Sequence, residues 1–203
     1  FPLQKTAASF KKGISTLLSS KNWMLFLLMV LLGGIGMATV NSYLFVYMGN
    51  LGLNNTLMGL ALTISTLSEI PVMFFASRFL KRFNPRDLLL VSLIIIGGRL
   101  LLYAVSTQAW QILLIQLIHG FTFPLIWMAG VSYADKVAPP GLSATAQGMF
   151  GSTLMGVGAA LGGLLGGLLL QYFNPAGMYL ITGITLLVGA LLFFLTRSKE
   201  NQA

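Results

Sequence analysis

Three ionisable residues lie inside long apolar stretches of this 203-residue sequence: Glu69, Arg99 and His119. A carboxylate, a guanidinium and an imidazole can together bind a polar solute, exchange a proton or form an ion pair. A charge at the centre of a bilayer costs at least ~2.5–3.5 kcal/mol on insertion scales, so such groups normally face a protein interior, a partner or water. Three of them on successive apolar stretches predict a shared polar cavity.

Other polar side chains lie at helical spacing around these three residues. His119 has polar residues three positions before it and three positions after it, and Arg99 has one four positions after it. Residues three or four apart share one face of a helix, so these side chains face the same region as the ionisable groups. We expect the cavity to be lined by Gln116, Thr122, Asn41, Tyr103 and Trp127.

A purely structural role is the alternative for these residues. Glu69 and Arg99 could form a buried ion pair that fixes the packing of two helices. Such a pair does not require a histidine at the same depth, and the helical rise of 1.5 Å per residue places all three residues roughly 10–20 Å below the outer boundary of a bilayer. We therefore favour a shared functional site over an ion pair alone.

The same residues argue against an enzyme. An intramembrane hydrolase needs a nucleophile with its base, or a cluster of metal ligands. The chain has one histidine and no cysteine, and Asp87 and Asp135 lie outside the apolar stretches. There is also no glycine-rich phosphate loop. We expect no catalytic residues, no metal site and no cofactor.

Composition places the chain in a membrane. Hydrophobic residues make up 56% of the sequence, charged residues only 8%, and the mean hydropathy is +0.86. Soluble domains contain about 25% charged residues. The net charge of +8 does not indicate a nucleic-acid partner, because the charges lie at the ends of apolar segments rather than on a polar scaffold. The expected partner is the lipid bilayer.

Six segments are long enough to cross a hydrocarbon core of ~30 Å as helices. No segment alternates with the period of two that a barrel strand requires. The predicted fold class is therefore all-α, a polytopic membrane protein with six transmembrane helices. The predicted spans are 22–48, 56–80, 87–106, 109–133, 143–171 and 177–196.

Basic residues predict the orientation of these spans, because they stay on the cytoplasmic side of a membrane. Eleven of the twelve lysines and arginines lie before the first span, around the second and fourth connections, or after the last span. The first, third and fifth connections have none. Both termini are therefore expected in the cytoplasm, with 1–21 as a surface segment, 22–196 as the bundle and 197–203 as a tail.

The fifth predicted span carries small residues at intervals of four. Gly158, Gly162 and Gly166 form one such row, and a second row contains Ala159 and Gly163. Small residues at this spacing allow two helix backbones to approach closely. The pattern predicts tight packing of this span, along a smooth face that would also allow sliding.

These residues resemble the major facilitator superfamily, specifically its carboxy-terminal six-helix half. The run SRFLKRFNPR over residues 77–86 is similar to the cytoplasmic G-x-x-x-D-R-x-G-R-R loop of that superfamily. Arg82 and Arg86 match the loop as candidate gating residues, whereas Ser77, Lys81 and Asn84 replace its two glycines and its aspartate. The resemblance implies twelve helices in the complete transporter, with residues 1–21 linking two halves.

Within this superfamily, the chain resembles the lactose-permease-like and phenylpropionate-permease-like proteins. Those proteins carry a membrane glutamate, arginine and histidine on three successive helices, as Glu69, Arg99 and His119 lie here. The resemblance implies that Glu69 and His119 contact substrate and that Arg99 assists proton coupling. Thr122 stands where the family has a proton-carrying carboxylate, so that role does not transfer.

The resulting hypothesis is a secondary active transporter of a bacterial inner membrane. It would move a small organic solute, a sugar or an aromatic or organic acid, by alternating access and with proton symport. Its partner would be a missing amino-terminal six-helix half or another copy of the chain. The alternatives are a solute or drug exporter of the same superfamily, and a non-transporting membrane receptor or assembly module whose polar trio only locks helices.

Overall fold

The computed structural model describes residues 13–200 of the chain, with side chains described to residue 195. The regular elements within this range are all helical. After the helical residues 13–19 they are, in chain order, α2 (Lys21–Asn50), α3 (Asn55–Phe74), α4 (Ala76–Arg82), α5 (Pro85–Val105), α6 (Ala109–Gln116), η1 (Leu117–Phe121), α7 (Phe123–Val137), α8 (Ser143–Gly151), η2 (Ser152–Val157), α9 (Gly158–Tyr172) and α10 (Pro175–Glu200).

Six helical segments of the described range are long and apolar enough to cross a membrane, which confirms the predicted number of spans. They are Lys21–Asn50, Asn55–Phe74, Pro85–Val105, Ala109–Val137, Ser143–Tyr172 and Pro175–Leu195.

Two of these segments are not continuous α-helices. The span from Ala109 to Val137 contains the 3-10 turn η1, and the span from Ser143 to Tyr172 contains the π-helical turn η2.

The second span ends earlier than predicted. Helix α3 stops at Phe74 because Phe75 leaves the helical region, with φ −91° and ψ 6°, and the short helix α4 begins at the next residue. The sequence had predicted one helix through residue 80. At the chain ends, residues 1–12 of the predicted surface segment lie outside the described residues, while residues 13–19 are helical and α10 continues to Glu200.

Asparagine and proline residues set where several spans begin. The side chain of Asn54 accepts a hydrogen bond from the Leu57 N–H at 3.0 Å, and that of Asn84 accepts one from the Arg86 N–H at 3.2 Å. Each satisfies a backbone donor that has no partner inside its helix. Pro85 follows Asn84 in the first turn of α5, where its fixed φ and its missing N–H are tolerated.

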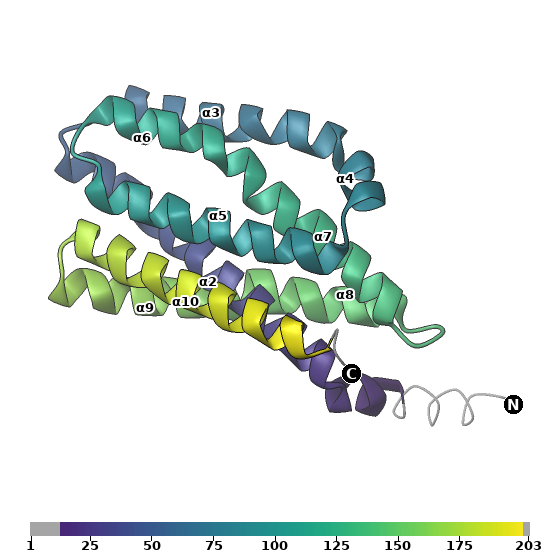
Figure 1. The fold of residues 1–203 in the computed structure, drawn as a ribbon. Helices are drawn as coiled ribbons and strands as arrows, with labels where there is room; N and C mark the ends of the chain where they lie inside the picture. The colour runs from purple at the N-terminus through teal and green to yellow at the C-terminus, as the bar shows by residue number, and fades with distance from the viewer. Residues whose placement is uncertain (1–12, 201–203) are drawn as a thin grey trace, which may run out of the picture.

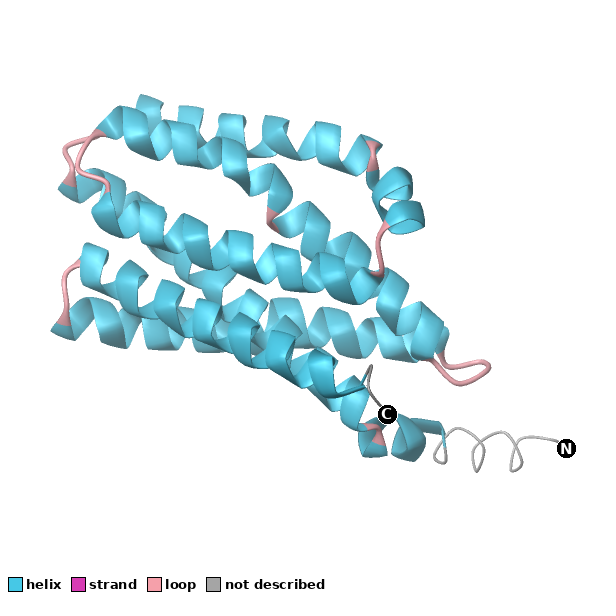
Figure 2. Ribbon diagram, in the orientation of Figure 1, coloured by secondary structure: helices cyan, strands magenta, loops and turns pink. Residues whose placement is uncertain are grey.

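The helices form a bundle with alternating direction (Figure 1). Helices α3 and α6 lie along one edge, α9 and α10 along the opposite edge, with α2 and α5 between them. The start of α2 and the end of α10 lie at the same end of the bundle, together with the α4–α5 and α7–α8 connections. The α2–α3, α5–α6 and α9–α10 connections lie at the opposite end (Figure 2). The bundle therefore separates the connections as the basic residues predicted.

Helix α2 packs against η2 and α9 at backbone contact. A methyl group added to Gly34 would lie 2.5 Å from the carbonyl oxygen of Leu154, and one added to Gly162 would lie 2.5 Å from that of Ile35. Gly158, Gly162 and Gly166 are all buried. The tight packing predicted for the first glycine row is thus confirmed, and its partner is α2.

The two adjacent glycines of α9 provide a matched test of this packing. Gly162→Ala should lower the free energy of unfolding by about 1–3 kcal/mol, because its methyl group meets backbone atoms that cannot yield. Gly163→Ala should leave stability unchanged or raise it, since the nearest atom to its methyl group is 4.0 Å away and alanine favours a helix. Thermal unfolding of the full-length protein in detergent measures both. Equal shifts for the two variants would contradict the backbone contact.

Candidate functional site

The structure brings Glu69, Arg99 and His119 into one hydrogen-bonded chain. The His119 Nε2 atom lies 2.9 Å from the Glu69 Oε1 atom, and the Arg99 Nη1 atom lies 2.7 Å from the His119 Nδ1 atom. His119 therefore stands between the carboxylate and the guanidinium. The direct Glu69–Arg99 ion pair considered from the sequence is not formed, because the imidazole occupies the space between the two charges.

The donors and acceptors of this chain fix the protonation of the imidazole. An arginine side chain has only donors, so the Nδ1 atom of His119 must accept from Arg99. The remaining ring proton then lies on Nε2 and is donated to the Glu69 carboxylate. A neutral imidazole thus connects a cation and an anion through two charge-assisted hydrogen bonds.

Arg99 is held from its own helix and from α6. Its Nη2 atom donates to the Tyr103 hydroxyl at 2.9 Å and to the Gln116 Oε1 atom at 2.7 Å. Arg99 is only 4% exposed, and both partners are buried. A buried charge needs such partners, because an unpaired one would lose several kcal/mol of hydration without compensation.

Tyr103 is itself held in place by Tyr47, near the end of α2. The Tyr47 hydroxyl donates to the Tyr103 carbonyl oxygen at 2.9 Å and also to the Ser106 carbonyl oxygen. The Tyr103 carbonyl belongs to the last turn of α5, where it also accepts from the Ser106 N–H at 3.1 Å, and Ser106 is the residue that follows the helix. Since Tyr47 belongs to α2, the position of Arg99 depends on how α2 and α5 pack.

The helix that carries His119 is broken at this residue. Leu117–Phe121 form the 3-10 turn η1, Thr122 has φ −100° and ψ −80°, and α7 begins with Pro124 in its first turn. Proline has no backbone N–H and clashes with the preceding helical turn, so the break falls directly before it. The Thr122 hydroxyl donates to the His119 carbonyl oxygen at 2.7 Å, which satisfies one acceptor of the broken turn.

Gly120 and Ser68 join this turn to α3. The Gly120 N–H donates to the Ser68 hydroxyl oxygen at 2.9 Å, and a methyl group on Gly120 would lie 2.0 Å from the Ser68 carbonyl oxygen. Only glycine allows this approach. Gly120 was not predicted as a site residue; its signal in the sequence is a glycine directly after the one intramembrane histidine.

The predicted lining residues divide into two groups. Gln116, Tyr103 and Thr122 belong to the hydrogen-bonded cluster. Asn41 instead lies on α2 in a small groove against η2 and α9, and Trp127 packs against Phe150, with ring centroids 5.5 Å apart. The structure does not bring these two residues to the cluster. The predicted cavity is, in this chain, a packed cluster whose side chains contact one another directly.

The two sides of the cluster differ in exposure. The Glu69 side chain is 25% exposed and that of His119 is 14% exposed, whereas Arg99, Gln116 and Thr122 are buried. The Glu69 carboxylate is therefore the more exposed end of the hydrogen-bonded chain. The residues whose side chains are described contain no group of three His, Cys, Asp or Glu side chains that could hold a metal ion.

The candidate gating residues lie elsewhere, Arg82 at the end of α4 and Arg86 at the start of α5. The Arg82 guanidinium carbon lies 5.7 Å from the centre of the Phe83 ring, and that of Arg86 lies 4.7 Å from the centre of the Phe193 ring on α10. Arg86 thus ties the start of α5 to the last helix. Neither arginine contacts Glu69, Arg99 or His119 in the described structure.

Comparison with known proteins places this architecture in a family. The chain matches the MFS_1 like family over residues 3–181. It is 31% identical over 169 residues to major facilitator superfamily domain-containing protein 6-like protein A of Xenopus laevis, which covers 83% of this chain and 28% of that protein. It is 29% identical over 203 residues to the maltose permease of Geobacillus stearothermophilus, which covers 100% of this chain and 52% of the permease.

A solved structure shares the fold. The crystal structure of nucleoside transporter NupG superimposes with a TM-score of 0.75 at 20% sequence identity, over 89% of this chain and 49% of that chain. The chain thus spans from about a quarter to about half of the length of these relatives. It is an integral membrane protein that belongs to the MFS_1 like family of major facilitator superfamily transporters, which are not enzymes, and it forms a six-helix half of their fold.

Proposed function

We propose that this chain is half of a secondary transporter that imports a small, neutral, hydroxyl-rich solute together with a proton. The observation that carries the proposal is the partly exposed Glu69 carboxylate, connected through His119 to a buried Arg99. Such a group in mid-membrane is costly to maintain and is usually kept for transport. The other six helices would come from an amino-terminal half or from a second copy, and both termini would face the cytoplasm of a bacterial cell.

Glu69 is the proposed proton carrier. Thr122 occupies the position where related proteins have a proton-carrying carboxylate, and its hydroxyl is engaged by the His119 carbonyl oxygen. When Glu69 is ionised, its carboxylate accepts a hydrogen bond from the His119 Nε2–H group. When Glu69 is protonated, this hydrogen bond is no longer strengthened by a negative charge. The bond joins α3 to η1, so protonation would change how firmly these two elements are held together.

The exposure of the cluster favours a neutral solute over an organic acid. Arg99 is buried and donates to three side chains, so it is not available for a solute carboxylate. Glu69 presents acceptor oxygens, which match the hydroxyl or N–H groups of a sugar or nucleoside. Maltose permease of Geobacillus stearothermophilus and xanthosine permease of Escherichia coli, which resemble this chain, carry names of solutes of this kind.

Glu69→Gln tests the proton-coupled mechanism. The amide keeps the size of the side chain but does not exchange a proton, so uphill accumulation driven by a proton gradient should be lost, while downhill exchange of solute should persist. Uptake by vesicles containing the full-length protein, with and without an imposed gradient, measures both. Asp135→Asn, at a carboxylate outside the cluster, serves as the control.

Three results would count against this mechanism. Unchanged uphill transport by Glu69→Gln would exclude Glu69 as the proton carrier. Gradient-driven movement in the outward direction would indicate an exporter. Full transport by both Glu69→Gln and His119→Ala would leave the cluster with a packing role only.

Competition for uptake tests the proposed solute class. Neutral sugars and nucleosides should compete for entry, and monocarboxylic acids of similar size should not, because the guanidinium of Arg99 is buried out of reach of a solute carboxylate. Unlabelled solutes added in excess to a labelled tracer measure this. Strong competition by an organic acid that disappears in Arg99→Gln would show that the guanidinium is accessible and would overturn the assignment.

A further inference from the structure

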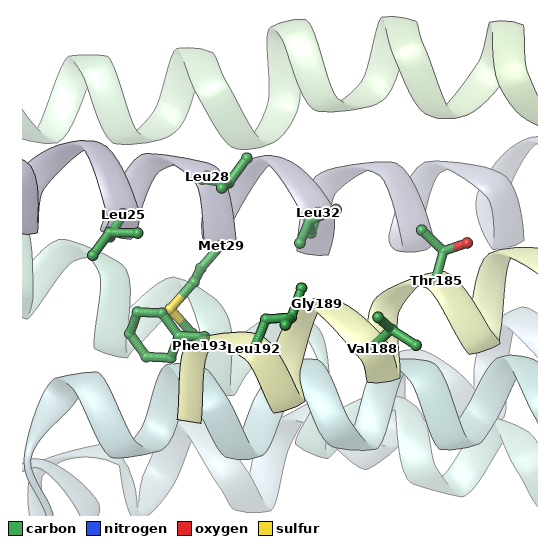
Figure 3. Close-up of a pocket in the computed structure, with 9 residues that line it drawn as sticks. All are labelled: Leu25, Leu28, Met29, Leu32, Thr185, Val188, Gly189, Leu192 and Phe193. Atoms are coloured by element: carbon green, nitrogen blue, oxygen red, sulfur yellow. The ribbon is translucent and has the colours of Figure 1, made fainter. Parts of the chain in front are cut away.

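An apolar groove of about 380 Å³ runs between the first half of α2 and the second half of α10, outside the polar cluster (Figure 3). Leu25, Leu28 and Leu32 line it from α2, and Val188 and Leu192 line it from α10. Thr185 is the one lining residue with a polar side chain, and its hydroxyl donates to the Ile181 carbonyl oxygen at 2.8 Å. The groove is therefore almost entirely apolar, and its one hydroxyl already donates its proton within α10.

A glycine shapes the groove. A methyl group on Gly189 would lie 2.6 Å from the Leu32 Cδ1 atom, so the absent side chain lets α10 come close to α2 at this level. The rims remain open, since Leu28 is 53% exposed, Val188 50% and Leu192 59%. In a membrane-spanning bundle these side chains lie at hydrocarbon depth, where an acyl chain is the apolar molecule available to fill the space between them.

The length of the groove fits one leaflet. Lys21, Leu25, Leu28 and Leu32 follow one another at intervals of four, three and four residues, so they lie on one face of α2. The twelve residues from Lys21 to Leu32 span about 16 Å along the helix, roughly half of the ~30 Å hydrocarbon core. An acyl chain in the groove would thus run from the membrane surface to the midplane.

Positive charge lies at the surface end of the groove. Lys21 is exposed and begins the helical face that lines it. Arg86 lies against the Phe193 ring that closes the groove on α10, with its guanidinium carbon 4.7 Å from the ring centre. No charged residue is among the described residues that line the groove itself. Basic residues beside grooves between helices on the cytoplasmic side attract anionic lipid head groups.

We propose that this groove binds one anionic phospholipid of the leaflet at the Lys21 end, with an acyl chain between α2 and α10 and the phosphate beside Lys21. The site is separate from the Glu69–His119–Arg99 cluster and does not depend on the transported solute. It would hold α10 against α2 from outside the bundle, because one acyl chain contacts both helices.

Retention of defined lipids by the full-length protein tests this proposal. The protein is purified in detergent, loaded with phosphatidylglycerol or phosphatidylcholine of the same acyl chains, and examined by native mass spectrometry. One phosphatidylglycerol should be retained about fivefold more than phosphatidylcholine, and Lys21→Gln should remove that preference. Val188→Trp, which fills the groove, should reduce retention of both lipids.

Two matched variants serve as controls. Lys136→Gln removes a basic residue in the last turn of α7, and Leu164→Trp enlarges an exposed residue on α9; neither position lines the groove, so both should retain phosphatidylglycerol like the unmodified protein. Equal retention of the two lipids, or unchanged retention in Val188→Trp, would overturn the proposal. A disulfide-linked dimer of the Leu28→Cys variant that retains no lipid would also overturn it, because the groove would then be occupied by a second copy of the chain.

Discussion

The guanidinium of Arg99 is a full positive charge inside an apolar bundle, and much of the structure around it provides hydrogen-bond acceptors. His119, Gln116 and Tyr103 each accept from it, and they come from two different spans. The carboxylate that balances its charge lies on a third span and is reached through the imidazole. Without this arrangement the cost of burying the charge would oppose folding of the bundle.

The bundle combines rigid and irregular parts. Helix α2 contacts η2 and α9 through glycines at backbone distance and reaches Tyr103 through Tyr47, so the elements that hold Arg99 are closely packed. By contrast, the His119 turn is a 3-10 segment before a proline, joined to α3 through Gly120 and Ser68. Broken helices in transporters place irregular backbone where it can contact solute or move. The proposed proton carrier lies at this irregular side.

Much of the fold follows from the sequence for simple reasons. A run of about 20 apolar residues between turn residues has few alternatives to a membrane helix, so the number of spans was predicted correctly. Glu69, Arg99 and His119 could be singled out because their charge stands out against apolar neighbours. The glycine row of α9 predicted close packing because its spacing of four places small residues on one face.

Other features depend on tertiary contacts that a single sequence does not contain. Hydropathy does not indicate which way a helix is rotated, so Asn41 and Trp127 were grouped with Glu69, Arg99 and His119, although they lie apart from that cluster in this chain. The place of His119 between Glu69 and Arg99 depends on the 3-10 turn, which in turn depends on the approach of Gly120 to Ser68. The break at Phe75 has no glycine or proline at that position, although basic residues follow it from Arg78 onward.

The π-helical turn η2 has a consequence for the direction of the side chains on its span. A π turn contains an additional residue compared with an α-helix, and each residue corresponds to a rotation of about 100° around the axis. The side chains of α9 are therefore rotated around the axis relative to the directions that they would have if α8 continued as a regular α-helix, although α8, η2 and α9 form one continuous helical span. Phe150 of α8 lies against Gly130 of α7, and Gly158 and Gly162 of α9 lie against α2.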